Sequence, residues 1–398
     1  QLINGSSATN FYNLTINEST SATTVTSQTT AFSVANNLTV TQGNLIIQAT
    51  DNNYTVTNNF TVSTNGTFTH SVNWDVAGRQ LTIGGNIDVT GIFTYTVRSH
   101  VQMTGTSKTI RTGTPPTSAL SILTLSGATV SANGTVTIND NFWAMFNTAG
   151  SFSTNGQTVT ANSGLLNSGG TVNVNGGSLT VTNGISIGGA GALNGTFNLS
   201  SGTVVTDGIT LGDAGGTLAN TITQTGGSLT VNGAVTINQP AANGITNTWN
   251  INAGTPTVSG LISFAGANTS NRFGRIVITT GTLNANGGIS FAGTTVANKV
   301  IDMSTGGGTG TINLKGALTG ANAATLTAGT SGSIFNYADN TTAQTVNFFG
   351  AGAYHNLHIN TTGGVGATLA AAITAGNVTG NLRVQSGTLN NGGFAITG

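Results

Sequence analysis

Apolar and polar residues alternate along most of this chain in short runs. Examples are Ile185-Ser-Ile187, Ile209-Thr-Leu211 and Trp249-Asn-Ile251. An alternation of period two places apolar side chains on one face of a strand and polar side chains on the other. Glycine and asparagine lie between the runs, where a turn needs positive φ. The pattern predicts many short strands, each with one buried face, and no amphipathic helix.

The predicted strands recur in a unit that opens on glycine. The opening glycines are Gly127, Gly150, Gly177, Gly202, Gly227, Gly254 and Gly281, separated by 23, 27, 25, 25, 27 and 27 residues. A fixed period in this range is typical of a solenoid, whose repeats bury their apolar faces by stacking on one another. We therefore predict an all-β fold, a parallel β-helix (β-solenoid) with about three short strands per coil of 23–27 residues.

The prediction treats residues 1–398 as a single continuous solenoid. Residues 44–125 are less regular and hold seven of the eighteen charged side chains. We interpret this stretch as coils with longer turns, and a lateral insertion is the alternative. Five phenylalanines occupy inward-type positions of the alternation and are expected in the core. They are Phe32, Phe60, Phe197, Phe264 and Phe291.

The composition narrows the range of partners. Nine acidic and nine basic residues give a net charge of zero, and charged residues make up 5% of the chain, against about 25% in a typical protein. Nucleic acid and anionic membranes attract clustered Lys and Arg, so neither is an expected partner. No apolar run approaches the about 18 residues that span a bilayer. A neutral surface favours self-association, because like charges do not hold the copies apart.

The two ends of the chain resemble each other. Residues 344–360 align without gaps to residues 1–17, and both contain the box Asn-Leu-x-Ile-Asn. Some 25 residues later, each is followed by Asn-Leu-x-Val-x-x-Gly, at residues 37–43 and 381–387. The chain therefore opens and closes in the same kind of coil.

With its Asn-Leu-x-Ile-Asn boxes and Gly-Thr-Leu repeats, the chain resembles the β-helical repeat regions of secreted bacterial surface proteins. These include the extracellular arrays of Bacteroidetes-like bacteria, and the chain is more loosely similar to autotransporter and filamentous-haemagglutinin-type passengers. The resemblance implies export and a secreted, extracellular or cell-surface location, for example in a biofilm matrix. It brings no catalytic residues with it.

Candidate chemistry is sparse. Parallel β-helices include carbohydrate-active enzymes, which need clustered acids, and the best pair here, Asp207 and Asp213, lies at ordinary turn positions. His355 and His358 are three apart in a strand, so they point to opposite faces and cannot share a metal. The chain has no cysteine and therefore no thiolate site or disulfide. We expect no enzyme activity, no cofactor and no metal.

Two further possibilities concern the surface. Threonine pairs suggest an ice-binding array, but Val204-Val205 and Pro256-Thr257 interrupt the series. Asn-x-Ser/Thr triplets make glycans possible. They include Asn13, Asn37, Asn53, Asn59, Asn65, Asn133 and Asn194.

The functional expectation comes from the ends, where no capping helix or charged tail is visible. Unprotected terminal coils can stack head to tail, and such a contact builds an open filament. We therefore expect a secreted structural protein that assembles with itself into an extracellular filament or matrix fibre. The alternative is an adhesin stalk, a fragment of a larger surface protein, and a carbohydrate-active enzyme is less favoured. The expected self-association residues are Leu2, Ile3, Phe11, Leu14, Ile16, Leu389, Phe394 and Ile396.

Overall fold

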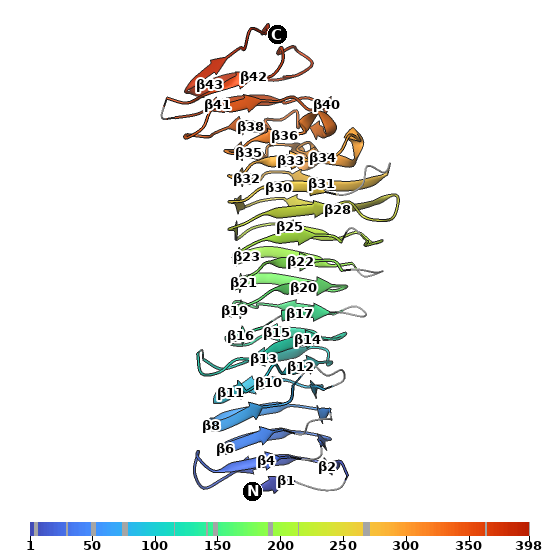
Figure 1. The fold of residues 1–398 in the computed structure, drawn as a ribbon, viewed down its shortest axis with the longest axis vertical. Coiled ribbons are helices and arrows are strands. Elements are labelled where there is room, and N and C mark those ends of the chain that lie inside the picture. Colours follow the sequence, from blue (N-terminus) through green and yellow to red (C-terminus); the bar gives the residue numbers. More distant parts are fainter. Residues whose placement is uncertain are drawn as a thin grey trace. The chain divides into compact units, whose positions relative to one another are not determined.

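The computed structural model describes the chain except for residues 4–6, 29–30, 49–52, 74–78, 115, 141, 146–149, 190–193, 214, 266–270, 363 and 398. The chain forms two compact units, Gln1–Asn183 and Gly184–Gly398. In each unit, short parallel strands lie one above another in ladders that run from coil to coil (Figure 1). Each unit is thus a β-solenoid, and the predicted fold class is confirmed.

Unit 1 contains three ladders. The first contains β1 (Leu2–Ile3), β4 (Thr24–Ser27), the second halves of β6 (Leu38–Ile47) and β8 (Phe60–His70), β11 (Ile92–Tyr95) and then β16 (Val136–Ile138), β19 (Thr158–Ala161) and the second half of β21 (Thr171–Val181). The second contains β2 (Thr9–Phe11), β5 (Phe32–Val34), β7 (Tyr54–Val56), β9 (Leu81–Ile83), β12 (His100–Met103), β14 (Ile122–Leu125), β17 (Phe142–Met145) and β20 (Leu165–Ser168). The third contains β3 (Leu14–Asn17), the first halves of β6 and β8, β10 (Ile87–Val89), β13 (Lys108–Arg111), β15 (Thr129–Ala132), β18 (Ser151–Ser153) and the first half of β21.

Unit 2 contains three long ladders and a short one. The first contains β22 (Ile185–Ile187), β24 (Ile209–Leu211), β27 (Val235–Asn238), β30 (Ile262–Ala265), β33 (Ile289–Phe291) and β36 (Leu318–Thr319). The second contains the first half of β23 (Thr196–Thr206), β25 (Thr221–Gln224), β28 (Ile245–Ile251), β31 (Arg272–Ile278), β34 (Lys299–Asp302), β37 (Thr325–Thr327) and β40 (Ala351–Gly352). The third contains the second half of β23, β26 (Ser228–Val231), β29 (Thr257–Val258), β32 (Thr282–Ala285), β35 (Thr311–Leu314), β38 (Ile334–Tyr337), β41 (Asn356–Asn360) and β43 (Leu382–Ser386).

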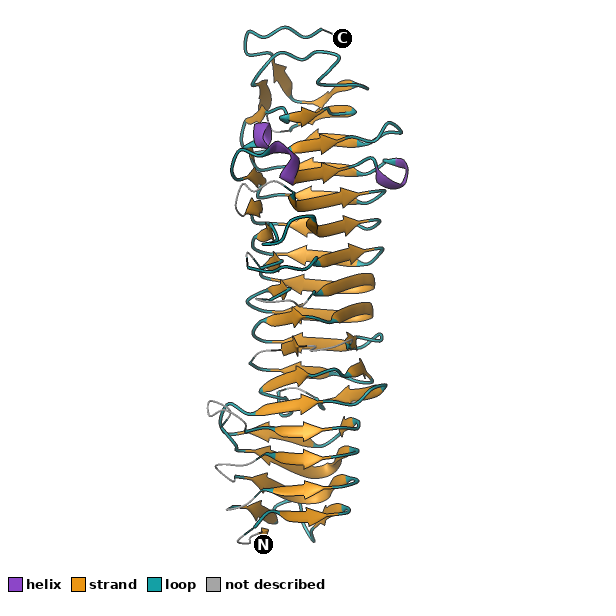
Figure 2. Ribbon diagram, turned by 90° about the vertical axis from the view of Figure 1, so that its right-hand side faces the viewer, coloured by secondary structure: helices purple, strands orange, loops and turns teal. Residues whose placement is uncertain are grey.

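The short ladder of unit 2 contains β39 (Gln344–Val346), β42 (Gly366–Leu369) and β44 (Thr388–Asn390). Short 3-10 helices lie in turns of the same unit, as Figure 2 shows in purple. They are η1 (Val296–Asn298), η2 (Thr305–Gly307) and η3 (Ala321–Ala323).

The core of each unit consists of columns of like side chains. Parallel strands pair in register, so an apolar residue in one coil lies directly above an apolar residue in the next. In unit 2 the rings of Phe264 and Phe291 stack with centroids 4.8 Å apart. The five phenylalanines predicted for the core are all buried, which confirms that prediction.

Residues 44–125 take part in the same ladders as the rest of unit 1. Strand β9 pairs with β7 and β12, and β10 pairs with β8 and β13. Some of the charge in this stretch forms contacts between coils, because Asp88 lies opposite Arg111 in register and accepts a hydrogen bond from its guanidinium. The strand register therefore brings the side chains of Asp88 and Arg111 together on the polar face.

Candidate functional site: the terminal coils

The first coils of unit 1 and the last coils of unit 2 have the same strand arrangement. Pairs β1–β4, β3–β6 and β4–β6 in residues 1–47 correspond to β39–β42, β41–β43 and β42–β44 in residues 344–390. The matching partners are Leu14↔Leu38 and Ile16↔Val40 in unit 1, and Leu357↔Leu382 and Ile359↔Val384 in unit 2. In both units the register shifts directly after the isoleucine of the box. The sequence similarity of the ends is therefore also a structural repeat.

The first asparagine of the Asn-Leu-x-Ile-Asn box, and the asparagine at the same position of neighbouring coils, joins one coil to the next. Its side-chain Oδ1 accepts a hydrogen bond from the backbone N–H of the asparagine one coil further on. In unit 1 these bonds join Asn37 N to Asn13 Oδ1 (3.1 Å), Asn59 N to Asn37 Oδ1 (3.2 Å) and Asn86 N to Asn59 Oδ1 (3.1 Å). In unit 2 Asn381 N donates to Asn356 Oδ1 (3.1 Å). The ladder satisfies a backbone donor at the turn before the strand, where no β-partner is available.

Apolar exposure concentrates in the terminal coils. Nine large apolar side chains are exposed among the described residues, and five of them belong to these coils. Those five are Leu2, Tyr12, Val384, Phe394 and Ile396. Sequence reasoning missed Tyr12 and Val384, because an apolar residue in a strand pattern is expected to face the core.

The predicted self-association residues lie in the terminal coils of both units and differ in exposure. Leu2, Phe394 and Ile396 are exposed, whereas Ile16 is buried in the core of unit 1. The remaining four are partly exposed: Ile3, Phe11, Leu14 and Leu389. In unit 1, Leu2, Ile3, Phe11, Leu14 and Ile16 lie in β1–β3. In unit 2, Leu389 lies in β44, and Phe394 and Ile396 follow it.

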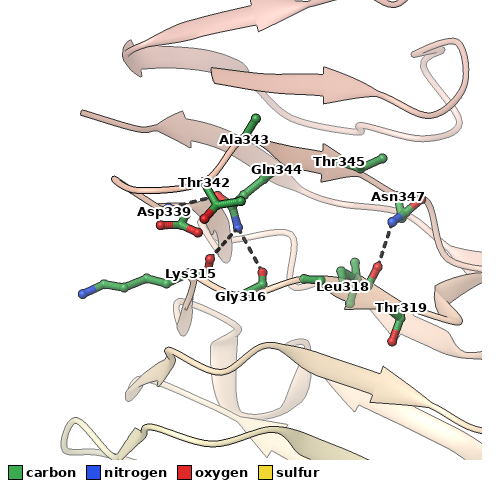
Figure 3. Close-up of a pocket in the computed structure, with 11 residues that line it drawn as sticks. Lys315, Gly316, Leu318, Thr319, Asp339, Thr342, Ala343, Gln344, Thr345 and Asn347 are labelled. Carbon is green, nitrogen blue, oxygen red and sulfur yellow. Dashed lines mark hydrogen bonds between the residues drawn. The ribbon is translucent and has the colours of Figure 1, made fainter. Parts of the chain in front are cut away.

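A groove of about 280 Å³ lies in unit 2 where one ladder is interrupted (Figure 3). Strand β36 pairs with β33 but not with β39 of the following coil. Three residues connect Leu314 to Leu318, whereas six connect Tyr337 to Gln344 one coil later. The longer turn separates the two strands and opens the groove.

Two amide side chains replace the missing ladder bonds. Gln344 Nε2 donates to the carbonyls of Leu314, Lys315 and Gly316 at 3.0–3.3 Å. Asn347 Nδ2 donates to the carbonyl of Leu318 at 2.7 Å (Figure 3). The Leu314 carbonyl also accepts from the N–H of Ala338, so the two amides add side-chain hydrogen bonds to the backbone pairing between these coils.

The charged side chains that line this groove are Lys315 and Asp339. Burial raises the pKa of Asp339, but hydrogen bonds from the backbone and side chain of Thr341 outweigh it, so the pKa lies below its usual range. The carboxylate is thus ionised at neutral pH and engaged by its own turn. That arrangement is suited to structure rather than to proton transfer.

The other candidate titratable residues are also engaged locally. Asp207 accepts a hydrogen bond from Asn232 Nδ2 (3.4 Å), and Asp213 accepts one from the N–H of Gly215 (3.3 Å). His355 Nδ1 lies 3.4 Å from Thr379 Oγ1. Burial and the neighbouring Arg383 lower the pKa of His358.

Unit 2 also contains an ion pair whose carboxylate is buried and whose guanidinium is partly exposed. Asp302 is almost fully buried and accepts hydrogen bonds from Ser304, Thr305 and the guanidinium of Arg275. Burial raises the pKa of Asp302, but these bonds outweigh it and lower the pKa to about 2. Every bond comes from the same coil or the adjacent one, so the carboxylate stabilises a turn.

Comparison with protein-family models, curated proteins and solved structures finds no match to this chain. Among the described residues, no three His, Asp or Glu side chains group closely enough to hold a metal ion. No helix in the described part of the chain is long and apolar enough to cross a bilayer.

Proposed function

We propose that this chain is a secreted structural protein whose coils associate head to tail with those of other copies into an extracellular filament or matrix fibre. The observation that carries this proposal is the repeated coil arrangement of residues 1–47 and 344–390. A chain that opens and closes in the same kind of coil presents related surfaces at both places. A head-to-tail contact between the first coils of one copy and the last coils of another extends as a filament when its rotation does not close a ring.

In the 398-residue polypeptide, strand edges that no described strand pairs support the association. In the described chain, β1, β2 and β3 pair only with the second coil, and β43 pairs only with β41. An unpaired edge is a template for another strand, because its N–H and C=O groups need partners. The zero net charge leaves no long-range repulsion to oppose this contact.

The coil of residues 344–360 supplies a precedent within the chain. It has the same box as residues 1–17, and it stacks on the preceding coil through β38–β41 and through Gln344. Gln1 occupies the position that corresponds to Gln344. A coil of this kind can therefore rest on another coil even where part of the ladder is missing.

A secreted location is supported by the resemblance to extracellular repeat regions and by a surface of hydroxyls and amides. Asp213 and Asp339 accept hydrogen bonds from backbone N–H groups of their own turns. The role that we propose is therefore structural rather than enzymatic.

The test is the size of the 398-residue polypeptide at neutral pH over a concentration series. We expect light scattering after size-exclusion chromatography to show mass increasing with concentration, and negative-stain microscopy to show fibres of uniform width. Leu2→Asp and Ile396→Asp should reduce association, because each places a charge on an exposed terminal residue. Leu218→Asp is the matched control, an exposed leucine outside the terminal coils.

A monomer of constant mass at every concentration would overturn the filament proposal. Such a result would favour the adhesin stalk instead. Equal loss of association in all three variants would also contradict it, since the contact would then not lie at the terminal coils.

A further inference from the structure

The groove beside Gln344 lies inside the stack of unit 2, because β36 pairs with β33 and β39 pairs with β42. A second hollow of about 350 Å³ shares Lys315, Gly316 and Asp339 with the lining of the groove. Asn286 of the preceding coil also lines this hollow. The groove and the hollow together form a trough across the same turn of three successive coils, and we call it the Lys315–Asp339 trough.

The backbone along the groove is largely engaged already. The carbonyls of Lys315, Gly316 and Leu318 accept hydrogen bonds from the side chains of Gln344 and Asn347. A polypeptide strand that adds to a sheet edge binds through such backbone groups. The trough therefore favours a ligand that side chains recognise over an added strand.

Two side chains of opposite charge lie at the same end of the groove (Figure 3). Lys315 is exposed, and the ion pairs of the described residues do not include it. Asp339 Oδ1 accepts from the N–H and the Oγ1 of Thr341 at 2.9 and 2.8 Å, so Oδ2 keeps the capacity to accept from a ligand. Hydrogen bonds to such charged groups are about twice as strong as those between neutral groups.

Neutral donors and acceptors complete the lining of the trough. Thr319, Thr342 and Thr345 are exposed along the groove, and each hydroxyl both donates and accepts. Asn286 Oδ1 is buried without a hydrogen-bond donor. A ligand hydroxyl would satisfy this oxygen directly or through a water.

We propose that the Lys315–Asp339 trough binds a short neutral saccharide. Adjacent hydroxyls of the sugar donate to the Asp339 carboxylate, another hydroxyl accepts from the Lys315 ammonium, and the threonine hydroxyls bond to further ring substituents. The charges of Lys315 and Asp339 cancel, so the trough favours a ligand without net charge. Ligand sites usually occupy about 300–1,000 Å³, so the volumes of about 280 and 350 Å³ suit a di- or trisaccharide.

The test is saturation-transfer NMR of the 398-residue polypeptide with cellotriose, maltotriose and chitotriose as probes, and with triglycine as the peptide alternative. We expect saturable transfer to at least one trisaccharide and none to triglycine. The Kd should be about 1 mM, because none of the lining residues is aromatic and the sugar rings have no surface on which to stack.

Single substitutions locate the binding. Lys315→Met and Asp339→Asn should each weaken it by about tenfold or more, because each removes a charged hydrogen-bonding group. The matched controls are Lys108→Met, at a lysine of unit 1, and Asp207→Asn, at an exposed aspartate elsewhere in unit 2. Both controls should bind like the parent chain, and circular dichroism checks that all four variants keep their strands.

Three outcomes would overturn the proposal: no transfer to any of the trisaccharides, stronger transfer to triglycine, or equal binding by the trough variants and their controls. Because the measurement follows the ligand rather than the mass of the protein, its result is independent of the filament proposal.

Discussion

Among single residues, His70 of unit 1 is placed where a charge cannot be accommodated. It has no exposed surface, and neither ring nitrogen has a hydrogen-bond partner. The rings of Phe68 and Phe93 lie 6.4 and 6.5 Å away. Burial, together with the neighbouring His100, lowers the pKa of His70 to about 3. Burial also lowers the pKa of His100 to about 4.

We expect the free energy of unfolding to fall as the pH is lowered from 7 to 4.5. The unfolded imidazole has a pKa of about 6.5, so the unfolded state binds protons that folded His70 refuses. The contribution of His70 is complete above about pH 6.5 and is lost as the pH falls toward its folded pKa. Two pH units below 6.5, the loss is about 3 kcal/mol.

Urea unfolding at both pH values measures this loss. His70→Leu is the control, because leucine fills part of the same volume and cannot be protonated. The variant should lose less stability between the two pH values than the parent chain. Identical pH dependence of parent and variant would contradict the assignment to His70.

At the scale of elements, the longer turn before β39 accompanies the loss of one strand pairing, that between β36 and β39. The extra three residues of this turn separate β39 from β36, and Gln344 then fills the space with three hydrogen bonds. The side chain is almost fully buried. The two coils are joined by the β35–β38 and β37–β40 ladders, and Gln344 supplies the contact at the side where β36 and β39 do not pair.

Gln344→Ala should destabilise this junction by about 1–3 kcal/mol, because it removes the side-chain hydrogen bonds to the carbonyls of Leu314, Lys315 and Gly316. Hydrogen exchange at the amides of β39 and β42 should quicken, while exchange in β22 and β24 stays unchanged. Thr345→Ala is the matched control, since Thr345 is exposed in the same strand. A Gln344 variant that exchanges like the Thr345 variant would show that the amide contributes nothing.

At the scale of the whole molecule, each unit is a stack in which a coil contacts mainly its neighbours. In unit 2, Ile185 pairs with Ile209, and Ile209 pairs with Val235 one coil further on. Stability in such a stack is approximately a sum of coil and interface contributions. Whole coils should therefore be removable, whereas partial coils should not.

Deletion of residues 209–234 removes one coil and places Val235 over Ile185. We expect the shortened chain to keep its β-sheet circular dichroism and a cooperative unfolding transition. Deletion of residues 209–221 is the control, because it removes half a coil and shifts apolar residues out of their columns. If both deletions unfold the chain equally, the coils are not independent structural units.

Much of the fold could be predicted from sequence because it depends on local pattern. The period-two alternation located strands such as Ile185–Ile187 and Ile209–Leu211, and the period of the glycines indicated the coil. The Asn-Leu-x-Ile-Asn box was visible as an identity between the ends. Its role as a hydrogen-bonding ladder was not visible, because that role depends on which residue lies one coil away.

The sequence alone determined the solenoid class, the core phenylalanines and the similarity of the two ends, because each follows from residue type and spacing. Only the tertiary structure decided that Val384 is exposed while the equivalent Val40 is buried. It also decided that a longer turn breaks the ladder beside Gln344. The physical reason is the same in both cases. Burial and pairing in a solenoid are set by the coil above or below, which lies about 25 residues away in the chain.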